Sequence, residues 1–328
     1  MIPRALLWLG IAASAAGALS AGEPGVEPPS GGRRPEIEGG FPPPQKIEEA
    51  PAFHEQTLVL ANVPEATGPR ISLFNGRDLE EFTPWLGFAN GTAFPSGPDD
   101  APLGETGMGD VFSVVTEDGR PAIYISGRPW GAIHTRRDLG DYHLSLWYKF
   151  GRQWNPQVPI NSGVLYHSHG SHGAFAGTWK SAVEFEMADG ITGLVVTIGS
   201  RMTAETELGK AGGRGVFGGD DFRYMAGGKR TEIRLPTMVK PNRYVELPPG
   251  QWNKLDLYVA QDRAVHVLND IPVVAISRIA VRGDDGVARP LTHGPVQLQS
   301  EGTEVFIRDI WIEPIRGVPD VVVGKPGR

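Results

Sequence analysis

The sequence predicts an all-β protein in which two antiparallel sheets pack as a sandwich or jelly roll. The chain of 328 residues contains 44 Gly and 29 Pro, which favours many short strands separated by turns. From residue 71 onward, short runs rich in β-branched and aromatic residues recur, and several alternate apolar with polar side chains. No window shows the sustained 3.6-residue period of an amphipathic helix. Together these patterns indicate two packed antiparallel sheets.

The predicted strands follow one another along most of the chain. They span residues 71–74, 111–116, 122–126, 142–150, 163–168, 181–188, 253–260, 264–269, 273–277, 296–300 and 304–315. Within SAVEFEMA (181–188), Val183 and Phe185 fall on one face, whereas Glu184 and Glu186 fall on the other. Residues 258–270 are typical of antiparallel hairpins. The glycine-rich stretch 199–250 is interpreted either as a long loop that shapes a binding site or as a surface insertion.

The first 20 residues are typical of a signal peptide. Arg4 precedes the apolar run LLWLGIAASAAGAL, and the residues 18–20, Ala-Leu-Ser, form a small-residue cleavage site. The apolar run is short for a membrane span, and an uncut N-terminal anchor is the alternative. We therefore expect a secreted or periplasmic protein with no membrane attachment after cleavage.

Composition divides the rest of the chain and excludes several classes of function. Residues 21–70 are rich in Pro and Gly and are predicted to be flexible, residues 71–315 to form the sandwich domain, and residues 316–328 to be a polar tail. A net charge of −7 without a basic block argues against nucleic-acid binding. The absence of cysteine excludes disulfides, thiolate ligands and cysteine nucleophiles.

Several pieces of sequence, taken in order, resemble the 3-keto-disaccharide hydrolase family, formerly a domain of unknown function. The pieces are LFNGRDL (73–79), ISGRPWGAIHTRRDLGDYHLSLWYKFG (125–151), NSGVLYHSHG (161–170), VEFEMADG (183–190), GQWNKLDLYV (250–259), VHVLND (265–270) and GPVQLQSEGTEVFIRDIWIEPI (294–315). The resemblance implies a concanavalin A-like jelly roll and a glycoside hydrolase or lyase that acts on sugars oxidised to a ketone at carbon 3. Two departures add acidity to the predicted site. Glu186 stands where relatives often have glutamine, and Ser300-Glu301-Gly302 follows the Leu-Gln pair where relatives often have an acidic residue or histidine followed by His-Gly.

This resemblance implies a chemistry that needs a base, an oxyanion stabiliser and a sugar platform. The base would remove the hydrogen on carbon 2, an enolate would form, the group at carbon 1 would leave, and water would add back. Glu184 and Glu186 could act as acid and base, and His167 is a second candidate base. Lys149 could stabilise the enolate, or it could protect the edge of a strand. Without the family, the glutamate pair could equally be an ordinary solvent-exposed face.

Four further residues are predicted to bind substrate. Trp130 could stack on a sugar face. Asn161 and Gln299 carry neutral amides suited to hydroxyl groups, although Asn161 could also be a turn residue. Glu301 adds an acidic group to the predicted site.

Three histidines crowd the run NSGVLYHSHGSHG (161–173). His167 and His169 share strand parity and could bind one cation, with His172 looping back as a third ligand. The alternatives are a single functional His167 with two exposed loop histidines, or a purely structural cluster. No metal ligand is assigned, and the cofactor is left open, with a divalent metal as one alternative.

We therefore predict an exported enzyme that cleaves 3-keto glycosides or disaccharides by carbon-2 proton abstraction, elimination and hydration, or by hydrolysis. A carbohydrate is the predicted partner. One alternative is a non-catalytic carbohydrate-binding module, because a fold alone does not determine function. The other is a conventional glycosidase that uses Glu184 and Glu186, although jelly-roll glycosidases place their acids four residues apart and Ala188 occupies that position here.

Overall fold

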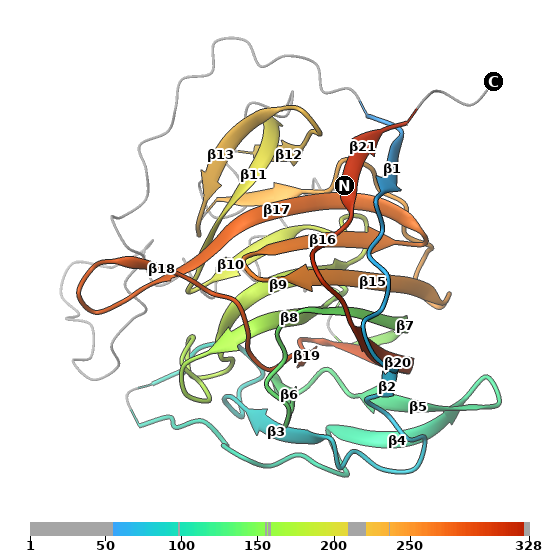
Figure 1. The fold of residues 1–328 in the computed structure, drawn as a ribbon. Helices are drawn as coiled ribbons and strands as arrows, with labels where there is room; N and C mark the ends of the chain where they lie inside the picture. Colours follow the sequence, from blue (N-terminus) through green and yellow to red (C-terminus); the bar gives the residue numbers. More distant parts are fainter. Residues whose placement is uncertain are drawn as a thin grey trace.

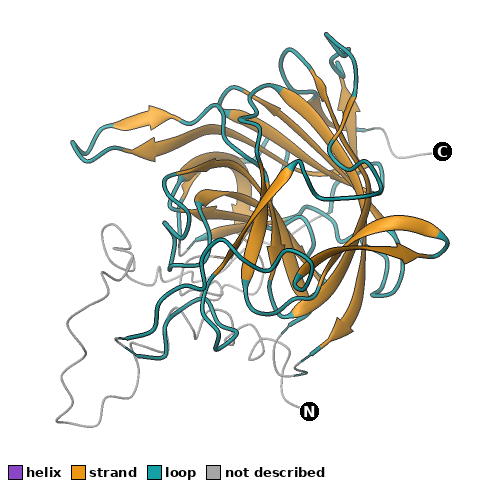
Figure 2. Ribbon diagram, turned by 90° about the horizontal axis from the view of Figure 1, so that it is seen from below, coloured by secondary structure: helices purple, strands orange, loops and turns teal. Residues whose placement is uncertain are grey.

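A computed structural model shows the fold. It describes residues 55–97, 99–154, 156, 159–208, 221–235 and 237–324. Every element in this part of the chain is a strand, and Figure 2 accordingly draws no helix. Among these residues there is thus no helix able to cross a membrane. The predicted signal peptide 1–20 and residues 21–54 lie outside the described residues.

One sheet, sheet I, carries the candidate site. Its strands in spatial order are β14 (Met238–Lys240), β10 (Val195–Ile198), β9 (Ser181–Ala188), β8 (Asn161–His169), β19 (Gln297–Ser300), β6 (Gly131–Thr135) and β3 (Phe82–Leu86). Pro84 lies on β3, which pairs with the strand β6 and otherwise forms only a single bridge, from Leu86 to Gly104, in the described part of the chain. An edge strand tolerates proline because its outer side needs no ladder hydrogen bonds.

The second sheet, sheet II, packs against sheet I. Its strands in spatial order are β18 (Ala288–Pro290), β17 (Ile271–Arg282), β16 (Arg263–Leu268), β15 (Asn253–Ala260), β7 (Tyr142–Gln153), β20 (Thr303–Pro314), β5 (Arg120–Ile125) and β4 (Phe112–Glu117), with β2 (Ile71–Ser72) also on β20 (Figure 1). The strands β11 (Arg201–Leu208), β12 (Asp221–Tyr224) and β13 (Lys229–Ile233) connect the sheets, since β11 pairs with β17 and β12 with β14.

The main core lies between the two sheets. Alternate residues of each strand point into it, among them Leu146 and Tyr148 on β7 and Val183 and Phe185 on β9, all fully buried. Apolar burial of this kind is the main force that stabilises a large domain without disulfides. The predicted all-β, concanavalin-like jelly roll is confirmed. The pairing of β12 with β14 is parallel, a departure from the expected purely antiparallel sheets.

The described parts of the two end segments, residues 55–70 and 316–324, contain a short two-stranded ribbon. Strand β1 (Leu58–Ala61) pairs with β21 (Asp320–Val323), so the inner ends of the segments 21–70 and 316–328 are ordered (Figure 1). Leu60 and Val321 pack against an apolar cluster that contains Tyr258, on the outer face of sheet II. The expectation for these ends is corrected because TLVLANV and DVVV bury apolar side chains together, which neither run can do alone.

The stretch 199–250 also contains more regular structure than expected. It forms β11, β12, β13 and β14, and only residues 209–220 and 236 within it lie outside the described part of the chain. In β11, buried Met202, Ala204 and Thr206 alternate with partly exposed residues, but the glycine-rich composition of the stretch hid this alternation at the level of the sequence.

Candidate functional site

A group of polar side chains lies on the outer face of sheet I, the face turned away from the main core. Its members come from three adjacent strands and one turn and are Asn161, Glu184, Glu186, Gln299 and Glu301. All five are buried, with exposed fractions between 1% and 4%. We call them the acidic group.

Strand register explains why these residues meet. Glu186 is paired with Gly163 on β8, and Glu184 with Leu165. Gln297 on β19 is also paired with Leu165, which places Gln299 beside Gly163 on the same face. The Ser162 hydroxyl donates a hydrogen bond to the carbonyl of Gln299 (3.0 Å), so β8 and β19 are held together at this point.

Gly163 provides the space in which two of the polar side chains meet. A Cβ atom at this position would overlap Glu184 Oε1 and would lie 2.6 Å from Gln299 Oε1. Both oxygen atoms therefore lie directly over the glycine. A glycine inside a strand weakens the strand, and it commonly marks a place where another group must approach the backbone closely.

The acidic group holds oxygen atoms that lack partners. Within the described residues, Glu184 Oε1, Gln299 Oε1 and Asn161 Oδ1 are buried without a hydrogen-bond partner. An unpaired buried acceptor typically costs about 1–3 kcal/mol. Such a cost is expected where a ligand or a proton completes the arrangement rather than where a core is simply packed.

Burial keeps the carboxyl groups largely protonated. Burial, together with the charges of Glu186 and Glu301, raises the pKa of Glu184 well above its usual value. Burial raises the pKa of Glu186 to about 8, although Asn161 and Glu184 act to lower it. Burial and the charge of Glu186 likewise raise the pKa of Glu301. Glu186 can thus exchange a proton close to neutral pH, as a general acid or base must.

Trp130 lies beside the acidic group and is itself covered. It is only 4% exposed, and its ring centroid is 5.9 Å from that of Trp179. Both belong to an apolar cluster on the outer face of sheet I that also contains Leu165, on the strand between β9 and β19. Trp130 thus contributes an apolar wall near the site, which differs from the open stacking platform expected.

His167 does not join the acidic group, contrary to its prediction as a base. Regular alternation would place it on the same face as Gly163 and Leu165, but His167 has a φ of +50° and the register shifts between Tyr166 and His169. This irregularity turns the ring away, and its Nε2 lies 2.9 Å from the backbone carbonyl of Gln261. The correction follows from the bulge, which the sequence pattern did not reveal.

The three histidines of the 161–173 run also separate from one another. His169 Nδ1 lies 3.2 Å from the carbonyl of His167, and the His172 ring packs against Trp85 with 5.3 Å between ring centroids. The described residues contain no group of three or more His, Asp or Glu side chains arranged to hold a metal ion. His167, His169 and His172 therefore do not form the three-histidine zinc site that was one alternative.

Lys149 lies on the opposite side of the molecule. On β7, Tyr148 and Phe150 point into the main core, so Lys149 faces outward from sheet II. Its ammonium group forms an ion pair with Glu117 and one of 2.7 Å with Asp118. Burial alone would lower the pKa of Lys149, but these hydrogen bonds raise it. Its predicted role at the enolate is corrected because strand parity directs it away from sheet I.

Replacing Lys149 by methionine is expected to leave turnover unchanged and to lower the free energy of unfolding by about 1 kcal/mol, the usual size for a partly exposed ion pair. Urea denaturation and a turnover assay measure the two quantities. Lys254→Met is the matched control, since Lys254 forms similar pairs with Asp256 and Asp270 on the same face. A large loss of turnover in Lys149→Met alone would contradict the structural role.

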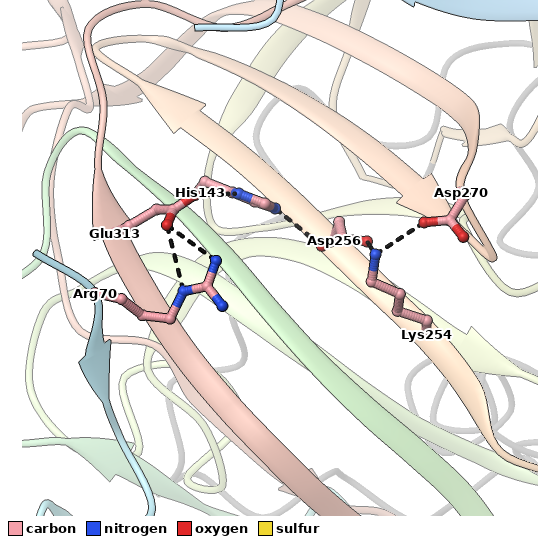
Figure 3. Close-up of polar contacts among 6 residues, drawn as sticks. All are labelled: Arg70, His143, Lys254, Asp256, Asp270 and Glu313. Atoms are coloured by element: carbon pink, nitrogen blue, oxygen red, sulfur yellow. Dashed lines mark hydrogen bonds and ion pairs between the residues drawn. The ribbon is translucent and has the colours of Figure 1, made fainter. Parts of the chain in front are cut away.

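A second polar cluster lies on the outer face of sheet II, and in it positive and negative side chains are paired, in contrast to the acidic group. It consists of Arg70, His143, Lys254, Asp256, Asp270 and Glu313 (Figure 3). Burial alone would raise the pKa of Asp256, but His143, Ser145 and Lys254 lower it. In the described part of the chain, no cation acts in this way on Glu186 or Glu301. This contrast favours a functional rather than a structural reason for the acidic group.

The jelly roll and the match to a family model place the chain in a carbohydrate-active class of domain. The chain belongs to the family of the 3-keto-alpha-glucoside-1,2-lyase-like domain, whose family model matches residues 69–313. The resemblance to 3-keto-disaccharide hydrolases drawn from the sequence is thus confirmed. Among curated proteins, no sequence matches the chain.

Solved structures with a similar arrangement of strands share little sequence with this chain. A provisionally assigned glycosyl hydrolase from Parabacteroides distasonis ATCC 8503 is 18% identical, with 75% of this chain and 94% of that chain covered and a TM-score of 0.42. The family GH16 endo-beta-1,3(4)-glucanase SCLam is 10% identical, with 83% and 98% covered and a TM-score of 0.42. The carbohydrate-binding module CBM66 from Bacillus subtilis is 11% identical, with 62% and 91% covered and a TM-score of 0.33.

Proposed function

We propose that this domain cleaves 3-keto glycosides by elimination and hydration at the acidic group. One observation carries the proposal. Glu184 Oε1 and Gln299 Oε1, which lie over Gly163, and Asn161 Oδ1, two residues before it on β8, are buried without partners beside carboxyl groups of raised pKa. A sugar with several hydroxyl groups would supply the missing donors. Family membership supports the choice of a ketone-bearing sugar.

The pKa values of the glutamates indicate which of them acts as the base and which as the hydrogen-bond donor. Glu186, with a pKa of about 8, provides the carboxylate that removes the hydrogen from carbon 2. The electron pair of that C–H bond forms the double bond between carbons 2 and 3, and the ketone oxygen becomes an enolate. Glu184, kept protonated by burial, and the Gln299 amide donate hydrogen bonds to that oxygen. A neutral carboxyl group held in a dry site is an effective oxyanion donor.

In the second half of the reaction the leaving group departs, water adds, and Glu186 and Glu301 return to their starting protonation states. The ketone at carbon 3 re-forms, the electron pair of the double bond between carbons 2 and 3 forms a new double bond between carbons 1 and 2, the bond from carbon 1 to the leaving oxygen breaks, and Glu301 gives that oxygen its proton. The Glu301 carboxylate then removes a proton from water, which adds to carbon 1, while protonated Glu186 returns its proton to carbon 2. Each residue ends in the protonation state in which it began, so no further reactant is needed.

The wild-type protein is expected to cleave 3-keto-trehalose or 3-keto-glucosides and to leave the unoxidised sugars intact. Because the proton on Glu186 exchanges with solvent before it returns to carbon 2, the product formed in D₂O should carry deuterium there, which mass spectrometry detects. Absence of cleavage across the panel would refute the proposal. Binding without turnover would indicate a carbohydrate-binding module, and cleavage of the unoxidised sugars a conventional glycosidase. Export remains a prediction, because residues 1–20 lie outside the described part of the chain.

A further inference from the structure

A pair of histidines on the outer face of sheet I has no part in the proposed reaction. His134 lies on β6, and His172 lies in the connection between β8 and β9. Their ring centroids are 4.6 Å apart, and the rings are nearly perpendicular, at 88°. His134 Nε2 and His172 Nδ1 are both buried and have no hydrogen-bond partner within the described residues. His134 as a whole is only 2% exposed.

The surroundings of His134 leave one nitrogen ready to bind a ligand. Its Nδ1 lies 3.0 Å from the backbone carbonyl of Thr83, which can only accept a hydrogen bond. Nδ1 therefore carries the hydrogen, and Nε2 holds a lone pair. A ring that donates to a backbone carbonyl on one side and offers a lone pair on the other is the usual arrangement of a metal-binding histidine.

Both rings are neutral at physiological pH. Burial lowers the pKa of His134 to about 4, against the effects of the Thr83 carbonyl and of the neighbouring Gln297 side chain. Burial and the nearby Lys180 lower the pKa of His172. Neutral imidazoles are the form that binds metal ions, so no proton has to leave before an ion binds.

We propose that His134 Nε2 and His172 Nδ1 together bind one divalent transition-metal ion of borderline softness, of which Zn²⁺ and Cu²⁺ are the natural probes. The spacing of the rings is within reach of two bonds of about 2.0–2.1 Å from one ion to the two nitrogens. In the described residues no third His, Asp or Glu completes the set. The remaining positions fall to water or to an oxygen atom of a bound molecule, as in open metal sites.

This metal site is separate from the acidic group. His134, Gln297, Leu165 and Glu184 form one row across four neighbouring strands. Three strand spacings separate His134 from Glu184, which corresponds to roughly 14 Å between their backbones. The site therefore neither requires the proposed elimination reaction nor depends on its outcome.

Metal binding to tag-free, chelator-treated protein tests the proposal. Isothermal titration with ZnCl₂ should show one equivalent bound, and Cu²⁺ should quench tryptophan fluorescence because Trp85 lies 5.3 Å from the His172 ring. His172→Asn and His134→Gln should each weaken binding at least about tenfold, because losing even the outer-shell partner of a metal ligand typically costs that much. Trp85→Phe should bind Zn²⁺ normally and show less quenching by Cu²⁺.

His293→Asn is the matched control, because His293 is an exposed histidine paired only with Asp138 in the described structure. It should bind metal as the wild type does. Since His134 is buried, its variant is first checked by near-ultraviolet circular dichroism. His172 is only partly buried, so its variant decides the question even if His134→Gln misfolds. Lack of stoichiometric binding by the wild type, or unchanged binding by His172→Asn, would overturn the proposal.

Discussion

Replacing Glu186 by glutamine is expected to lower turnover of a 3-keto glycoside by about 10²–10⁴-fold, the usual contribution of a general base. Glutamine keeps the size of the side chain but cannot accept the proton from carbon 2. Glu232→Gln is the control, since Glu232 lies at the surface with a side chain that is 63% exposed. Full turnover by Glu186→Gln would show that Glu186 is not the base of the reaction.

The same variant should change how stability depends on pH. The pKa of Glu186 is raised to about 8 in the folded protein, and in the unfolded chain it returns to an ordinary value of about 4.3. The folded state therefore holds an extra proton between these values, and the wild type loses up to about 1.4 kcal/mol of stability per pH unit as the pH rises through this window. In the Glu186→Gln variant this pH-dependent loss of stability does not occur, because glutamine does not ionise.

Urea denaturation of the two proteins at several pH values between 5 and 9 (about the span of the two pKa values) measures this difference. The advantage of Glu186→Gln over the wild type should grow with rising pH and level off once Glu186 is ionised. Taking the difference cancels the opposite contribution of buried histidines such as His134, whose pKa is lowered to about 4 by burial. A difference that does not vary with pH would show that Glu186 is not protonated in the folded state.

Gly163→Ala is expected to abolish most of the activity while the fold is kept. The added methyl group would overlap Glu184 Oε1 and crowd Gln299 Oε1, so both side chains must move from their places. Gly163 is not among the residues with positive φ, so alanine fits the backbone itself. We expect a loss in turnover on the order of 10²-fold, as misplacement of reacting groups typically causes, and a stability cost of about 1–3 kcal/mol from overpacking.

Gly140→Ala is the matched control for this substitution. A Cβ atom at position 140 would meet Thr292 O at 3.9 Å and His293 Cβ at 4.0 Å, which are ordinary contacts. This control should retain turnover and stability. If Gly163→Ala were as active as Gly140→Ala, the region over Gly163 would not be the reaction centre.

The strands that carry the acidic group were predictable because their alternation is strong. In SAVEFEMA, apolar and acidic residues alternate from Val183 to Met187, so parity alone places Glu184 and Glu186 on the face opposite Phe185. Gln297 and Gln299 alternate with Leu298 in the same way. In both runs, β9 and β19, the side chains that face the core in the structure are those that the alternation of the sequence predicts.

Other site assignments failed where parity was interrupted or where the identity of the sheet mattered. His167 would face the acidic group in a regular strand, but the irregularity after Tyr166 redirects it. Lys149 has a clear parity, yet its strand belongs to sheet II, and sequence alone does not say which strands share a sheet. The pairing of His172 with His134 joins segments 38 positions apart, and no local pattern signals it.

The sequence by itself determined the all-β class, the main strands, the family and the acidic face of β9, because these follow from alternation and from motifs that are local along the chain. Only the tertiary structure decided that Asn161, Gln299 and Glu301 join that face over Gly163, that Lys149 stands on the far side, and that two distant histidines meet. The physical reason is that strand order and register bring together residues from remote positions, and the burial that results sets their pKa values.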